Sequence, residues 1–162
     1  MSPAKRWVVL AAGVAAALAG WAGVAAAAAD EGPVRVKVLG IRATNEEKPH
    51  VDAELEPIRD SLARSGYNSF RVVAKEQRDV EEGVAAEFTL IEDYALRVEA
   101  SAADEESVTL TLTWVRYETD AKGRRVARVL QRMPMTLRRG KFFVSGGWQL
   151  KEGALIAAMS AE

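Results

Sequence analysis

Alternation of apolar and polar residues with a period of two constrains this chain more than any other feature of its sequence. It is clearest over 107–118 (SVTLTLTWVRYE), where two rows interleave: Val108, Leu110, Leu112 and Trp114 in one, Thr109, Thr111 and Thr113 in the other. Successive side chains of a strand point to opposite faces, so the apolar row belongs in a core and the threonine row can meet water. This segment predicts a half-buried strand of an antiparallel sheet.

The same alternation, or a short apolar run between turn residues, predicts seven further strands near 34–41, 70–73, 86–90, 96–100, 124–138, 141–150 and 154–160. In the first of them the alternation slips at Gly40, which indicates a β-bulge. Pro134 lies inside the basic segment 124–138 and favours an edge position or a bulge, because proline cannot donate to a neighbouring strand. The short connections imply antiparallel neighbours.

Only residues 52–65 (DAELEPIRDSLARS) indicate a helix. Its apolar residues fall on one face at spacings of three and four: Leu55, Ile58 and Leu62. Asp52 can cap the N-terminus and Gly66 can end the helix. Pro57 does not fit a regular interior, so we expect the regular helix to begin there, after one tight turn.

Together these elements predict an α+β domain. We expect a mainly antiparallel β-sheet, or a two-layer sandwich of about eight strands, with one helix after the first strand. Eight strands can also close into an open barrel, which is the alternative. The sequence shows no internal repeat and no second domain.

Residues 1–29 predict a cleavable signal peptide. Two basic residues precede an uncharged apolar run that ends in small residues before Asp30, as a signal peptidase site requires. We therefore expect cleavage between Ala29 and Asp30 and a single globular periplasmic domain over 30–162. A retained membrane anchor is the alternative, because the 23 apolar residues of 7–29 are enough to span a bilayer.

The sequence contains no cysteine, which excludes several kinds of site and modification. These are disulfides, thiol catalysis, cysteine-ligated zinc and attachment of a lipid to cysteine. The sequence has 15 arginines against 7 lysines and is rich in alanine, a bias typical of GC-rich bacterial genomes. Together with the signal peptide, this bias indicates an envelope protein of a bacterium.

Charge is unevenly distributed along the chain. Residues 30–106 carry 19 acidic and 10 basic side chains, a balance of −9, whereas residues 107–162 carry 4 acidic and 10 basic ones, a balance of +6. Such asymmetry can mark a surface that meets an anionic partner. The alternative is that the two halves neutralise each other across neighbouring strands.

The basic segment contains the predicted partner-binding residues, Arg124, Arg128 and Arg132. Their spacing of four places them on one face of a strand, with Val126 and Leu130 between them. Guanidinium groups bind carboxylates and phosphates bidentately. We expect envelope or periplasmic proteins with acidic surfaces as partners, no nucleic acid, and no stable membrane insertion after cleavage. A solvated edge without a partner is the alternative.

No pattern in the sequence predicts catalysis. His50 is the sole histidine, whereas a hydrolytic zinc site uses two or three nitrogen ligands. Ser145 precedes two glycines but lacks the G-x-S-x-G order of a nucleophile turn. Four carboxylates on or beside predicted strands alternate with apolar positions, as solvent-facing residues do: Glu87, Glu92, Asp93 and Glu99. We therefore expect no catalytic residue, no metal and no cofactor.

The aromatic residues near the C-terminus are predicted to be structural. Phe142, Phe143 and Trp148 lie within seven residues, and such groups more often anchor a core than stack on a ligand. Gly146 and Gly147 before the tryptophan indicate a turn or a bulge.

The order of the segments also carries a family resemblance. A strand, the helix D-x-x-L-x-P-I-x-x-x-L, the sequence Tyr67-Asn68-Ser69-Phe70 and a meander ending in GGWQLKEGALIAAMS follow one another. This order resembles small exported domains of unknown function in myxobacteria and related bacteria. Size, signal and the missing lipid site are similar to a small periplasmic component of the myxobacterial gliding-motility machinery.

The resemblance implies a role in an envelope complex and brings no catalytic residues. We expect a non-enzymatic periplasmic protein-interaction domain that acts as an adaptor or assembly component, and the resemblance implies gliding motility as its process. A binding module for an anionic cell-envelope glycan or lipid is one alternative. A small cell-wall hydrolase is the other.

Overall fold

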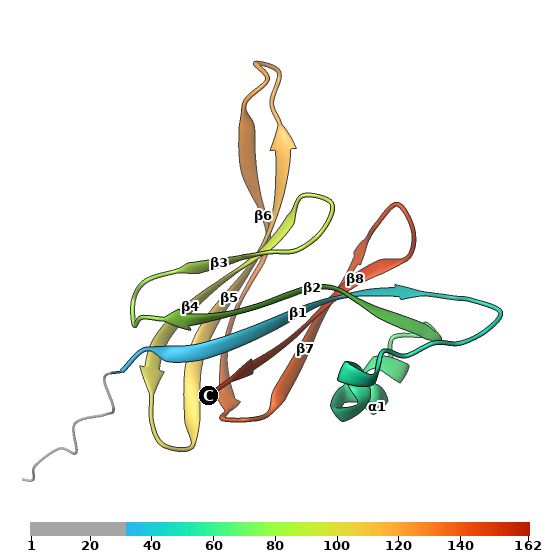
Figure 1. The fold of residues 1–162 in the computed structure, drawn as a ribbon. Coiled ribbons are helices and arrows are strands. Elements are labelled where there is room, and N and C mark those ends of the chain that lie inside the picture. The colour runs from blue at the N-terminus through green and yellow to red at the C-terminus, as the bar shows by residue number, and fades with distance from the viewer. Residues whose placement is uncertain (1–31) are drawn as a thin grey trace, which may run out of the picture.

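A computed structural model describes residues 32–162, which form two four-stranded antiparallel sheets and one helical segment (Figure 1). The strands are β1 (Val34–Thr44), β2 (Ser69–Val80), β3 (Ala86–Thr89), β4 (Tyr94–Ala103), β5 (Ser107–Thr119), β6 (Arg125–Arg138), β7 (Phe142–Gln149) and β8 (Ala154–Ala161). The predicted α+β class is confirmed in its two-layer form. The predicted signal peptide lies outside the described residues.

The two sheets pack face to face around one hydrophobic core. The first sheet has the strand order β2-β1-β8-β7 and the second has the order β3-β4-β5-β6. The apolar row of β5 lies in this core, together with Phe88 and Leu155, whereas the threonines on the other face are half-exposed. The prediction that β5 has one buried face and one wet face is confirmed.

The helical segment covers the other face of the first sheet. It consists of a 3-10 helix, η1 (Ala53–Ile58), followed by the short α-helix α1 (Arg59–Ala63). Its apolar face joins residues of β1 and β8 in a second core, which contains Leu55, Ile58, Leu62, Leu39, Ile41 and Ile156. A tight 3-10 turn does precede the regular helix, as predicted, but Pro57 lies inside the 3-10 helix and the α-helix begins at Arg59 rather than at Pro57.

Asp52 holds the helical segment by a contact that differs from the predicted cap. Its carboxylate makes no capping hydrogen bond to the helix. Oδ2 instead accepts the backbone N–H of Val72 in β2 at 2.7 Å, and Oδ1 lies 2.7 Å from Nε2 of His50. These contacts lower the pKa of Asp52, the bond from Val72 most of all. The carboxylate therefore ties the helix to the edge of the first sheet.

The apparent slip in β1 arises from the change in what covers its outer face. Even-numbered residues such as Val36 face the core between the sheets, whereas odd-numbered ones face outward. Outward positions are polar up to Lys37 and apolar from Leu39 onward, where the helical segment covers them. The register shift does occur at Gly40, as predicted, but the extra residue is Val73 of β2.

Two short connections do not join neighbouring strands, contrary to expectation. The chain crosses from one sheet to the other between β2 and β3 and again between β6 and β7. The last strand, β8, then returns to pair with the first. All eight residues of β8 are buried because it lies between β1 and β7 with a core on each face.

Candidate functional site

β6 is an edge strand, as Pro134 predicted. It pairs with β5 over its whole length of 14 residues and has no strand on its other side within the described part of the chain. Most of its residues are exposed, including two valines, Val126 (41 % exposed) and Val129 (56 %). In Figure 1 the tip of the β5–β6 hairpin projects beyond the rest of both sheets. An edge of this kind carries backbone groups that can pair with another chain.

A bulge in β6 divides the predicted arginine row between the two faces of the second sheet. The prediction that the arginines share one face was therefore wrong. The register passes from Trp114 opposite Gln131 to Val115 opposite Val129, which leaves Leu130 as the extra residue. One inserted residue reverses which face each later side chain takes. Leu130 therefore packs on the core between the sheets, and the row does not continue through it.

The positions opposite the arginines confirm the division. Arg128 lies opposite Arg116, whereas Arg132 lies opposite Thr113. Arg116 and Thr113 are three residues apart on β5 and so point to opposite faces. Arg128 thus lies on the inner face of the second sheet, which carries the core, and Arg132 lies on its outer face.

On the inner face, Arg116 is held over an aromatic ring. Its guanidinium carbon lies 5.4 Å from the ring centroid of Tyr94. Tyr94 is buried and donates its hydroxyl to the backbone oxygen of Gln149 at 3.0 Å. These groups border a hollow of about 410 Å³ at the rim of the sandwich, lined by Glu92, Asp93, Tyr94, Arg116, Gln149, Leu150 and Lys151.

On the outer face, a second set of side chains lies beside Arg132. A shallow hollow of about 330 Å³ is lined by Ala85, Arg97, Glu99, Thr111, Thr113, Val129 and Arg132. Next to it, Arg97 donates from Nε to Glu87 at 2.7 Å, and the hydroxyl of Tyr117 donates to Glu87 at 2.6 Å. Arg125 covers the ring of Tyr117, with its guanidinium carbon 4.0 Å from the centroid.

Arg124, the third predicted residue, lies in the turn before β6. Its guanidinium pairs with Asp120, with Nη2 at 2.8 Å from Oδ2, and its backbone N–H donates to Oδ1 of the same carboxylate. Hydrogen bonds from the backbone N–H and the guanidinium of Arg124 lower the pKa of Asp120. The pair fixes the hairpin turn and leaves Arg124 68 % exposed.

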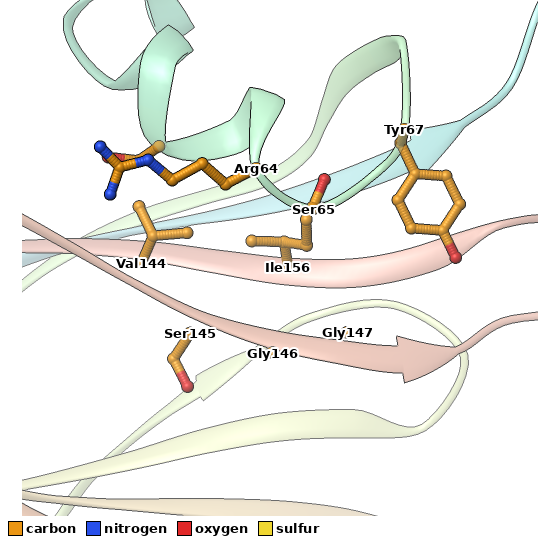
Figure 2. A pocket seen from close by; sticks show the side chains of 9 residues that line it. Arg64, Ser65, Tyr67, Val144, Ser145, Gly146, Gly147 and Ile156 are labelled. Carbon is orange, nitrogen blue, oxygen red and sulfur yellow. The ribbon is translucent and has the colours of Figure 1, made fainter.

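Ser145 and His50, for which the sequence predicts no catalytic role, lie on different sides of the first sheet. Ser145 accepts a hydrogen bond from Nε1 of Trp114 at 3.2 Å, so it faces the core between the sheets, whereas His50 contacts Asp52 on the helix side. Figure 2 shows the hollow of about 370 Å³ between α1 and β7, in which Ser145 points away from Arg64 and Tyr67. Ser145 and His50 therefore make separate contacts and are not brought together.

The acidic candidates are engaged elsewhere or lie in shallow sites. Burial raises the pKa of Glu87, but the hydrogen bonds from Tyr117 and Arg97 outweigh it and hold the pKa below its ordinary value. A glycosidase acid needs a raised pKa, so Glu87 does not fit that role. Glu92 accepts the backbone N–H of Lys151 at 3.0 Å, and Asp93 lies 3.8 Å from Arg125.

The aromatic residues near the C-terminus pack as predicted. Trp148 stacks edge-to-face on Trp114 at a centroid distance of 5.9 Å and lies against the core between the sheets. Gly147 is the extra residue in a bulge between β7 and β8, which confirms the predicted bulge before the tryptophan.

Within residues 32–162, no three acidic or histidine side chains lie close enough together to hold a metal ion. None of the helices described is long and apolar enough to cross a membrane. Comparisons with protein-family models, with curated proteins and with solved structures found no match. The resemblance to myxobacterial envelope domains therefore stays a prediction.

Proposed function

We propose that this chain is a non-enzymatic protein-interaction domain of the bacterial cell envelope, which binds an acidic segment of a partner protein along the free edge of β6. The observation that carries this proposal is the edge itself: 14 residues long, mostly exposed and rich in arginine. A peptide that adds to a sheet edge gains main-chain hydrogen bonds, and its side chains are selected by the groups beside the edge.

The division of the arginines by the bulge supports an edge-binding partner. A strand paired to β6 sends alternate side chains to the two faces of the second sheet. It therefore meets Arg128 and Arg116 on the inner face and Arg132 and Arg125 on the outer face. A partner lying flat on one face meets only one of these pairs.

The edge also resists pairing with a second copy of itself. Arginines on both copies repel each other, and Pro134 removes one backbone donor from the strand. An acidic partner meets no such repulsion, because opposite charges favour its approach and set its register. The exposed valines Val126 and Val129 supply the apolar contacts that a charged edge lacks.

Charge reversal tests the proposal directly. We expect the variant with Arg124→Glu, Arg128→Glu and Arg132→Glu to be exported and folded, because exposed charges contribute little to stability. It should no longer retain, after crosslinking in the periplasm, a protein that co-purifies stoichiometrically with the unchanged chain. The matched control carries Lys48→Glu, Arg59→Glu and Arg64→Glu, the same charge change before, within and directly after the helical segment, and should retain the partner.

Two outcomes would overturn the proposal. Full recovery of the partner by the β6 variant would show that the arginines do not bind it. Salt-sensitive recovery of envelope polymer in place of a stoichiometric protein would favour the anionic glycan or lipid alternative. The location in the periplasm rests on the apolar N-terminal segment, and the role in gliding motility rests on the resemblance alone.

A further inference from the structure

We propose that Arg116 and Arg128 form a carboxylate-binding site on the inner face of the β5–β6 hairpin, which receives an acidic group of the partner peptide. This inference rests on the proposed function and specifies it further: it names the position at which the edge distinguishes an acidic segment from a neutral one.

The first observation is that two like charges lie directly opposite each other. Arg116 of β5 pairs in register with Arg128 of β6. Directly opposite residues have Cβ atoms about 5 Å apart, and like charges there destabilise the strand pair. The charge of Arg128 is only weakly compensated: its Nη1 lies 3.5 Å from Oε1 of Glu118, and both side chains are well exposed. The free chain therefore retains repulsion that a bound anion would relieve.

The second observation is that Arg116 is oriented before any ligand arrives. Its guanidinium lies over the ring of Tyr94, and that ring is buried and fixed by its hydrogen bond to Gln149. The N–H donors of a guanidinium lie in one plane, where two of them can meet the two oxygens of a carboxylate. Less side-chain entropy is lost on binding, because the ring already restricts Arg116.

The third observation is that the acidic residues at the rim make their contacts with groups other than Arg116. Glu92 accepts the backbone N–H of Lys151, and Asp93 lies beside Arg125. Within residues 32–162, Arg116 forms neither an ion pair nor a side-chain hydrogen bond. It borders the hollow of about 410 Å³ at the rim, which has room for an acidic side chain or a peptide terminus.

Acetate tests the site without any peptide. In NMR spectra of the mature protein, acetate should shift the Nε–H signal of Arg116, and chloride at the same ionic strength should not. Arg128→Gln should weaken the acetate response. The same response to both anions, or a response unaffected by Arg128→Gln, would overturn the carboxylate site, whatever happens along the rest of β6.

A set of peptides then separates the site from the edge. The probes are blocked peptides of alternating valine and glutamate, the same peptide with glutamine, and the glutamine peptide with a free C-terminal carboxylate. We expect the glutamate peptide to shift backbone amides along β6 and to bind about tenfold more weakly to Arg116→Gln and to Arg116→Lys, because the planar pair of charge-assisted bonds is lost. Arg138→Gln, at the far end of the same strand, should bind it normally.

Each result has a distinct meaning. Tighter binding of the glutamate peptide than of the free C-terminus assigns the site to side chains, and the reverse order assigns it to a terminus. Amide shifts along β6 with unchanged affinity in both Arg116 variants would refute the site and leave the proposed function standing. No shift along β6 with any probe would refute strand addition, whereas the acetate result would still decide whether the arginine pair binds a carboxylate.

Discussion

Replacing Leu112 with alanine tests the arrangement of the two layers, because Leu112 is 1 % exposed in the centre of the clearest strand. The substitution removes three buried carbons, which at about 0.8 kcal/mol each amounts to roughly 2.4 kcal/mol of lost transfer free energy. The cavity left behind adds to this cost, and measured values for such changes span about 2–5 kcal/mol.

The neighbours of Leu112 place the expected value in the lower part of that range. Met133 lies opposite it in β6 and Val98 opposite it in β4. Met133 is only partly buried, and its flexible side chain can move into the space. We expect a loss of about 3 kcal/mol, which is a large share of the roughly 5–15 kcal/mol that stabilises a typical native protein.

Urea unfolding followed by tryptophan fluorescence measures this loss as a midpoint shift of roughly 1–3 M. The control is Thr111→Ala, one residue earlier and half-exposed on the outer face, for which we expect a loss below about 1 kcal/mol. Equal losses at the two positions would show that both faces of β5 are covered, which would refute the reasoning from alternation.

The remaining predictions concern the β7 bulge, acid stability and the β3–β4 turn. Gly146→Ala should cost at least about 2 kcal/mol in urea unfolding, because φ is 131° and a Cβ would lie 2.7 Å from the backbone oxygen of Leu155. The pKa of Glu87 is lower in the folded protein than its ordinary value of 4.5. Ionised Glu87 therefore stabilises the fold at any pH above 4.5, and this stabilisation is lost as the pH falls through the lowered pKa. Glu87→Gln should therefore lower the melting temperature at neutral pH and flatten its fall below about pH 4.5. Asp93→Gly should raise the melting temperature, because Asp93 is exposed and has a φ of 66°, at which a non-glycine residue is strained; a lower melting temperature would show that its contact with Arg125 outweighs the strain.

Local pattern predicted the elements well because each signal is confined to a few neighbouring residues. The alternation in 107–118 predicted which face of β5 is buried, and Pro134 predicted that β6 lies at an edge; the structure confirms both. The same patterns could not predict which strands pair. A period of two shows that a strand has two faces, but it does not identify the neighbours.

The arginine row shows where pattern reasoning failed. Three residues spaced by four share a face only while the strand is regular, and the bulge at Leu130 breaks that condition. A signal was available in the sequence: Met133, Met135 and Leu137 are apolar at odd positions, which places Arg132 on the face opposite to theirs. The pairing of Arg116 with Arg128 depends on the register of the hairpin, which no local pattern shows.

The most direct test of the central claim compares the two faces of the edge separately. One variant carries Arg116→Glu and Arg128→Glu on the inner face, and the other carries Arg125→Glu and Arg132→Glu on the outer face. Quantitative recovery of the crosslinked periplasmic partner is measured for both, after circular dichroism has shown that both are folded. Strand addition at β6 predicts that each variant loses the partner, because an added strand sends side chains to both faces. Loss in one variant and full recovery in the other would contradict strand addition and show that the partner docks on a single face.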